Sequence, residues 1–236
     1  MLADRIENIG SGELSEGVEI DASIKAVIEF IETHFSHFSE KVKGEITASE
    51  KALTDKLCKY LNRVAEPYPF YFHHENVEDP SSGISAQTDI GTLSTDEQIT
   101  VGDRHYNEFD SFFSIEAKRL PTPGHNRERE YVIGHQKPNG AIERFKKGIH
   151  GRNLNYAAVI GYVQNEDFDF WFLKVNGWIE ELIKTSPTEW MDDDKLRKMA
   201  ESNDQLAKFE SDNIRIPAKS SSDKIRLFHF WITLVN

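Results

Sequence analysis

Residues 110–120 read Asp-Ser-Phe-Phe-Ser-Ile-Glu-Ala-Lys-Arg-Leu, an apolar run that contains one acid and one lysine two positions apart. The run predicts a β-strand over 111–119. Side chains two residues apart share a face of a strand, so Glu116 and Lys118 point the same way, with Cα atoms about 6.6 Å apart. A carboxylate and an ammonium in this position form either a structural ion pair or a pair of catalytic groups. The opposite face carries Phe113, Ile115 and Ala117.

An upstream segment supplies a second acid. Residues 85–93, which follow a turn-forming Pro-Ser-Ser-Gly stretch, predict another strand with Asp89 inside it. Asp is depleted in strand interiors, so this one needs a partner. If the two strands pair, Asp89 comes close to Glu116 and Lys118. Adjacent carboxylates repel unless a cation neutralises them, and Mg²⁺ suits such a site. The alternative is a hairpin with a surface Asp–Lys salt bridge.

A third acid lies on a predicted helix over 45–64. Its apolar stripe, continued backwards from Leu53, reaches Glu50. An acid on a buried stripe is unusual without a partner. Alternatively, Glu50 lies at the start of the helix, where the dipole favours negative charge and Thr47 or Ser49 acts as the cap. The stripe consists of Ile46, Leu53, Leu57, Tyr60, Leu61 and Val64.

The order is therefore a helix with an inward Glu, a strand, a strand with Asp and a strand with Glu-x-Lys. This order resembles the PD-(D/E)XK nuclease superfamily, which has the restriction-endonuclease-like fold. The matching residues are Glu50, Asp89 and the tripeptide Glu116-Ala117-Lys118. Thr88 stands where the family name has proline. The long spacing between Asp89 and Glu116 requires an extended strand or an excursion, and it leaves Asp103 and Asp110 as rival first acids.

The resemblance covers 45–165 and implies an α/β fold, with a mixed central β-sheet flanked by helices and an αβββαβ core. The expected core elements are the helix 45–64, strands near 69–75, 85–93 and 111–119, a helix near 138–150 and a strand over 156–163. We expect an N-terminal helical extension over 1–44, with a helix around 21–35. Residues 166–236 are expected to add C-terminal helices over 166–184 and 192–210 and a closing strand over 224–235, all in one globular domain.

The resemblance also implies an activity. Asp89 and Glu116 would bind Mg²⁺, for which Mn²⁺ would substitute, with the Ala117 carbonyl as a third ligand and Glu50 acting directly or through water. Lys118 would orient the attacking water or help to deprotonate it. The expected function is a metal-dependent nuclease, a DNA endonuclease of the restriction, repair or antiviral type, acting as a homodimer or in a larger complex. The alternatives are a non-catalytic nucleic-acid-binding or assembly subunit on the same fold, and an unrelated α/β protein.

Charge is distributed unevenly along the chain. The net charge is −12, yet residues 118–152 hold 9 basic and 3 acidic side chains, a balance of +6. Affinity for phosphates rests on Lys and Arg, so this basic block predicts the nucleic-acid contact. Arg119, Arg144 and Lys147 are the expected phosphate contacts, and the 121–139 loop is expected to touch substrate. The alternative is a solvated charged surface.

Composition excludes several other classes of protein. Cys58 is the only cysteine, so an internal disulfide and a cysteine-based zinc site are excluded. Cys58, His34, His37, His73 and His74 are expected to have packing or surface roles. No apolar run reaches the length of a membrane span and the N-terminus lacks a signal-peptide pattern, so a cytoplasmic location is expected.

Overall fold

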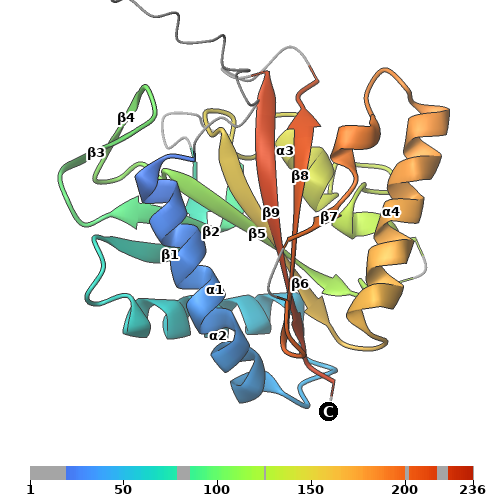
Figure 1. Ribbon diagram of the computed structural model, residues 1–236, viewed down its shortest axis with the longest axis horizontal. Helices are drawn as coiled ribbons and strands as arrows, with labels where there is room; N and C mark the ends of the chain where they lie inside the picture. Colours follow the sequence, from blue (N-terminus) through green and yellow to red (C-terminus); the bar gives the residue numbers. More distant parts are fainter. Residues whose placement is uncertain (1–19, 79–85, 125, 200–201, 217–222, 236) are drawn as a thin grey trace, which may run out of the picture.

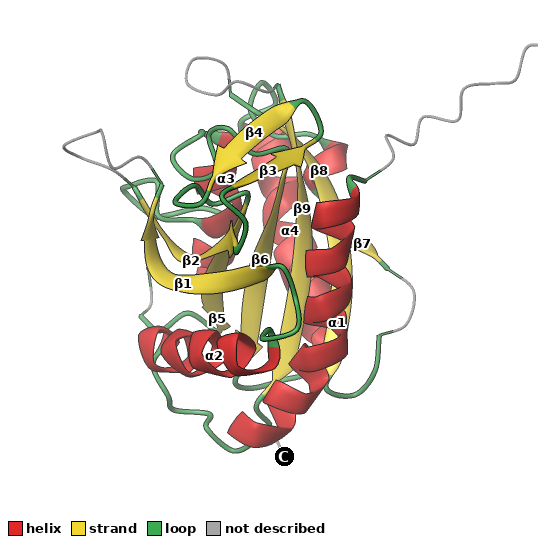
Figure 2. Cartoon of the chain, turned by 90° about the vertical axis from the view of Figure 1, so that its left-hand side faces the viewer, coloured by secondary structure: helices red, strands yellow, loops and turns green. Residues whose placement is uncertain are grey.

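A seven-stranded mixed β-sheet lies at the centre of the computed structural model, and helices cover both of its faces (Figure 1, Figure 2). The structure describes residues 20–78, 86–124, 126–199, 202–216 and 223–235. The first 19 residues of the expected N-terminal extension lie outside the described residues, as does His125 of the basic block. The predicted α/β class is confirmed.

The strand order of the sheet is β1-β2-β5-β6-β9-β8-β7. The pairs β5–β6 and β6–β9 are parallel, and the other pairs are antiparallel. A separate hairpin consists of β3 and β4. The strands are β1 Phe70–Val77, β2 Gln87–Ser94, β3 Gln98–Val101, β4 Arg104–Asn107, β5 Phe113–Leu120, β6 Tyr156–Val163, β7 Arg197–Lys198, β8 Leu206–Ile214 and β9 Lys224–Thr233.

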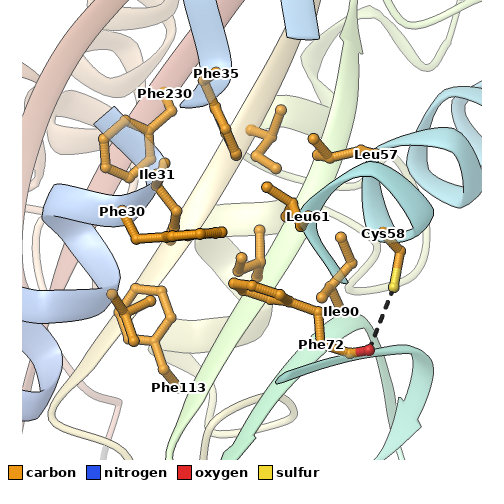
Figure 3. Close-up of a cluster of buried hydrophobic side chains, with 14 of the residues drawn as sticks. Phe30, Ile31, Phe35, Leu57, Cys58, Leu61, Phe72, Ile90, Phe113 and Phe230 are labelled. Atoms are coloured by element: carbon orange, nitrogen blue, oxygen red, sulfur yellow. Dashed lines mark hydrogen bonds between the residues drawn. The ribbon is translucent and has the colours of Figure 1, made fainter. Parts of the chain in front are cut away.

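Two helices lie on each face of the sheet. The helices are α1 Ala22–Val42, α2 Glu50–Val64, α3 Ala141–Lys146 and α4 Phe168–Thr185, with 3₁₀ turns η1 Glu128–Tyr131 and η2 Asp192–Asp194. One core packs α1 and α2 against the sheet through aromatic and aliphatic side chains such as Phe30, Leu61 and Phe113 (Figure 3). The other core packs η1, α3 and α4 against the opposite face and includes Trp171 and Trp231.

The predicted helix over 45–64 begins later than expected. The Ser49 side chain accepts a hydrogen bond from the backbone of Ala52 at 3.2 Å and caps α2, so Glu50 is the first helical residue. Ile46 precedes the helix and is exposed, so it does not belong to the buried stripe. The predicted helix near 138–150 is shorter too, because the chain turns at Gly148, where φ is +60°.

The predicted helix over 192–210 is wrong. Of this segment, 192–194 form a 3₁₀ turn, 197–198 an edge strand, and 206 onward the long strand β8. The composition, rich in Lys, Leu, Met, Ala and Glu, favours a helix locally. Cross-strand contacts override that preference: Asp212 pairs with Arg197 at 2.6 Å and with Arg226 at 2.7 Å.

The long interval between Asp89 and Glu116 is filled by the β3–β4 hairpin, which is the excursion that the spacing required. Asp103 lies in the hairpin turn and is exposed. Asp110 accepts hydrogen bonds from the backbone and side chain of Asn107, so it closes the turn that follows β4. These contacts tie Asp110 to its local turn. Within the part of the chain that the structure covers, no helix has the length and apolar character needed to cross a membrane.

Candidate active site

The site lies where β2 and β5 separate. The two strands pair between Ile90–Thr92 and Phe113–Ile115. One residue further, the side chain of Asp89 takes over from the backbone, and its Oδ2 accepts a hydrogen bond from Ala117 N at 2.7 Å. The structure therefore brings Asp89 beside the Glu116-Ala117-Lys118 tripeptide, and it does not bring the rival Asp110 there.

The Lys118 ammonium lies at the centre of the acid cluster. Its Nζ is 3.0 Å from Glu116 Oε1, 3.2 Å from Glu50 Oε1 and 2.8 Å from the carbonyl oxygen of Ala117. The side chains of Lys118 and Glu116 are 6% and 1% exposed. Charge-assisted hydrogen bonds in such a site are stronger than those in water, so the four groups form one electrostatic unit.

Glu50 joins this unit from the first turn of α2. Both interpretations of Glu50 apply, because it starts the helix and also points into the site. Its Oε1 faces Lys118, and its Oε2 accepts a hydrogen bond from the backbone N–H of Arg119 at 3.2 Å. The helix start therefore joins α2 to the end of β5 through one carboxylate.

Glu116 has further partners on its other side. Arg144 Nη1 donates to Glu116 Oε1 at 2.8 Å, and His150 Nε2 lies 3.6 Å from Glu116 Oε2. Glu116 Oε2 is buried and has no hydrogen-bond partner among the described residues. Burial favours a raised pKa for Glu116, but attraction to Lys118 and Arg144 outweighs it and the pKa is lowered. Glu116 therefore carries its charge in the interior.

The same surroundings have opposite effects on the charges of Asp89 and Lys118. Burial, reinforced by the charge of Glu116, raises the pKa of Asp89 to about 7. Burial also disfavours the Lys118 ammonium, but Glu116, Glu50 and Asp89 outweigh that effect and raise the pKa of Lys118 above its usual range. Lys118 keeps its proton in this arrangement, which favours the orienting role expected of it over removal of a proton from water.

The donor set can be tested against the expected Mg²⁺. As the side chains stand, no three His, Cys, Asp or Glu residues in the described ranges form a metal-binding group. However, Glu116, Glu50 and the Ala117 carbonyl all converge on one cation, the Lys118 ammonium. They offer the hard oxygen ligands that Mg²⁺ takes. A bound cation would give Glu116 Oε2 the partner that it lacks, and it would stabilise the charged form of Asp89, whose pKa is raised. The residues fit a divalent cation once the ammonium moves aside.

The basic block does not form an uncompensated positive stripe. Among the described residues, at least six of its nine cations pair with carboxylates: Lys118, Arg127, Arg129, Arg144, Lys146 and Lys147. Of the expected phosphate contacts, Arg144 pairs with Glu116 and Lys147 with Glu143 at 2.6 Å, while Arg119 Nη1 donates to the carbonyl of Ala48 at 3.3 Å. Arg119 and Arg144 lie at the acid cluster, and Lys147 caps the C-terminal end of α3, the short helix that carries Arg144.

Two residues of the site were missed at the sequence level. His150 is buried beside Arg144 and Glu116, and its only sequence signal was its place in the basic block. Glu78 follows β1, and both of its oxygens accept from Gly151 N at 2.8 Å. Burial raises the pKa of Glu78 to about 7. No periodicity marks Glu78, because it lies beyond the end of its strand.

The 121–139 loop, expected to touch substrate, carries a hollow. A cavity of about 340 Å³ is lined by Asn126, Glu128, Arg129, Ile133, Gly134 and His135. The Glu143 carboxylate holds this loop against α3 by accepting from Gly134 N at 2.9 Å. The substrate contact itself stays a prediction.

A comparison of the chain with models of known families, with curated proteins and with solved structures finds no match.

Proposed function

We propose that the protein is a metal-dependent nuclease of the PD-(D/E)XK superfamily that hydrolyses phosphodiester bonds, and that it is a DNA endonuclease. One observation carries the proposal: Glu50, Asp89, Glu116 and Lys118, spread over 69 positions of sequence, meet where β2 and β5 separate. Burying several charges is costly, and such clusters are typical of functional sites. Three acids around one lysine in a largely buried position therefore favour a catalytic role.

The proposed roles follow from these contacts. Asp89, Glu116 and the Ala117 carbonyl would hold Mg²⁺ or Mn²⁺, and Glu50 would complete the set directly or through water. The bound ion would supply Lewis-acid stabilisation of the developing charge and lower the pKa of water. Lys118, which keeps its proton, would donate to the attacking water or to a phosphate oxygen and offset negative charge in the transition state. Arg119, Arg144 and Lys147 are the proposed phosphate contacts.

Cleavage of supercoiled plasmid tests this function. The purified protein is incubated with Mg²⁺ or Mn²⁺, with EDTA and Lys118→Ala as controls. We expect metal-dependent nicking that EDTA abolishes and that the variant loses by orders of magnitude. Circular dichroism of the variant shows whether it has folded. Full activity in folded Lys118→Ala would contradict the proposal.

A second candidate is a non-catalytic nucleic-acid-binding or assembly subunit on the same fold. The observation that favours it is that the charge of Glu116 is already compensated within the protein, by ion pairs with Lys118 and Arg144. This subunit would bind nucleic acid without binding Mn²⁺, and its binding would not change in Asp89→Asn. Homodimer formation and a cytoplasmic location stay predictions of the sequence.

A further inference from the structure

Arg144 reaches from α3 into the acid cluster. Its Nη1 donates to Glu116 Oε1 at 2.8 Å, and Lys118 donates to the same oxygen at 3.0 Å. One oxygen of Glu116 therefore receives two cationic donors. The Glu116 side chain is 1% exposed and the Arg144 side chain is 27% exposed, so the Arg144 side chain lies partly at the surface whereas Glu116 is enclosed.

A frame of acceptors holds the guanidinium in this position. Arg144 Nη1 lies 3.1 Å from His150 Nε2, Nε donates to the Pro138 carbonyl at 3.2 Å, and Nη2 donates to Asn139 Oδ1 at 3.4 Å. The backbone folds back as well, because the N–H groups of Ile149 and His150 donate to the Arg144 carbonyl. The planar fork of an arginine loses little freedom in such a frame.

His150 acts in this frame as an acceptor. The residue is 2% exposed, and its ring lies edge-on to Phe145 at 6.1 Å between centroids. Because Nε2 faces an Arg144 N–H, the ring proton belongs on Nδ1. Among the described residues, Nδ1 has no hydrogen-bond partner. In this tautomer the accepting Nε2 of His150 faces the guanidinium at 3.1 Å, and it also lies 3.6 Å from Glu116 Oε2, beyond hydrogen-bond distance.

Lys147 provides a natural contrast on the same short segment. It pairs with Glu143 at 2.6 Å, an acid that holds the loop and does not touch the acid cluster. Lys147 and Arg144 carry the same charge and lie three residues apart, but only Arg144 occupies Glu116. Variants of Arg144 and Lys147 therefore remove the same charge from the same region, but only a variant of Arg144 removes a contact with Glu116.

We propose that Arg144 is a built-in counter-ion of Glu116 that leaves the carboxylate when a divalent cation binds, and that His150 is the residue that positions it. The inference rests on the proposed nuclease function and adds a link between metal loading and release of a guanidinium. Like charges a few ångströms apart repel strongly in a buried site, so the divalent cation and the guanidinium compete for Glu116. The released, part-exposed guanidinium is then available to a phosphate of the substrate.

Binding of Mn²⁺, followed by loss of the free-ion EPR signal, tests the inference without an activity assay. The proteins compared are the wild type, Asp89→Asn, Arg144→Met, the matched control Lys147→Met, and His150→Phe with His150→Gln. We expect Arg144→Met to bind Mn²⁺ about tenfold or more tightly than the wild type, which is the change that about 1.4 kcal/mol produces. Lys147→Met should change the affinity by less than about twofold, since its partner lies outside the site.

His150 is expected to act through Arg144. His150→Phe removes the acceptor and should tighten Mn²⁺ binding, whereas His150→Gln, whose amide oxygen can accept, should keep the affinity of the wild type. Thermal unfolding in EDTA checks that each protein is folded, and Arg144→Gln replaces Arg144→Met if the latter does not fold.

The outcomes separate this inference from the proposed function. If the wild type binds Mn²⁺, Asp89→Asn abolishes binding, and Arg144→Met binds no more tightly than the wild type, the counter-ion role is overturned while the metal site stands. Equal tightening in Arg144→Met and Lys147→Met also overturns it, because general charge then explains the effect. If no folded variant binds Mn²⁺, the inference and the proposed function both fail.

Discussion

At the residue scale, Asp89 and Lys118 are held in the same site for opposite electrostatic reasons. The charge on Asp89 is disfavoured by burial and by Glu116, and its pKa is raised to about 7. The charge on Lys118 is favoured by three acids, and its pKa lies above the usual range. Removing the charge of Asp89 should therefore not destabilise the folded protein, whereas removing the charge of Lys118 should lower its free energy of unfolding.

This difference gives a stability prediction for metal-free protein. Asp89→Asn keeps the shape of the side chain and an acceptor for Ala117 N, and we expect no loss in the free energy of unfolding at about pH 8. Lys118→Met leaves Glu116 and Glu50 without their central cation and should cost about 3–5 kcal/mol. Urea denaturation in EDTA measures both. A comparable loss in the two variants would contradict the assigned electrostatics.

His229 predicts a pH dependence of stability away from the site. Its ring is fully buried between Tyr131 OH at 2.8 Å and Ser211 Oγ at 2.9 Å, and burial lowers its pKa from 6.5 to about 3. The unfolded chain binds the proton first, so the stabilising effect is complete above pH 6.5 and declines as the pH falls towards 3.

Between about pH 8 and about pH 5 this group should lower the free energy of unfolding by about 2 kcal/mol. His229→Gln, which can still donate and accept, should lose that part of the dependence. Denaturation curves of both proteins at the two pH values provide the test. Parallel pH profiles for the two proteins would show that His229 is not the cause.

At the scale of elements, the core order was predictable because its elements carry strong periodic signals. The apolar run of β6 and the stripe of α2 indicate buried elements from local sequence. The alternation in β5 placed Glu116 and Lys118 on one face, as the structure has them. The segment 192–210 was mispredicted because its helix-forming composition is local, whereas the partners of Asp212 lie on β7 and β9.

A buried ion pair joins α3 to η2 and is a sensitive point of this arrangement. Lys146 Nζ lies 2.5 Å from Asp194 Oδ1 with both side chains fully buried, and it also donates to the carbonyl of Ile214 at 3.1 Å. Burial lowers the pKa of Lys146 and raises that of Asp194. The pair is therefore costly to keep and more costly to break.

We expect Asp194→Ala to lower the free energy of unfolding by about 3–5 kcal/mol, since it strands a buried ammonium. The double variant Lys146→Met with Asp194→Leu should lose much less, because no charge remains to be buried. Thermal and urea unfolding of the single and double variants measures the difference. A double variant at least as unstable as the single one would show that the pair itself stabilises the fold.

At the scale of the whole molecule, charge counted along the sequence differs from charge arranged in space. The block 118–152 has a balance of +6, yet most of its cations pair with acids, some from distant elements. The partner of Arg129 is Glu181 and that of Lys146 is Asp194, contacts that no local pattern indicates. Strand periodicity could predict that Glu116 and Lys118 share a face, and the family resemblance named Asp89 with Asp103 and Asp110 as rivals. Neither could predict that Arg144 and His150 surround Glu116.

Cleavage by the wild type and by Asp89→Asn is the most direct test of the central claim. Both proteins are incubated in excess over supercoiled DNA, linear duplex, single-stranded DNA and RNA, with Mg²⁺ or Mn²⁺. The proposed nuclease predicts metal-dependent hydrolysis of at least one substrate and a loss of at least about a hundredfold in Asp89→Asn, a variant expected to fold as well as the wild type. Hydrolysis at equal rates by both proteins, or by neither on any substrate, would contradict it.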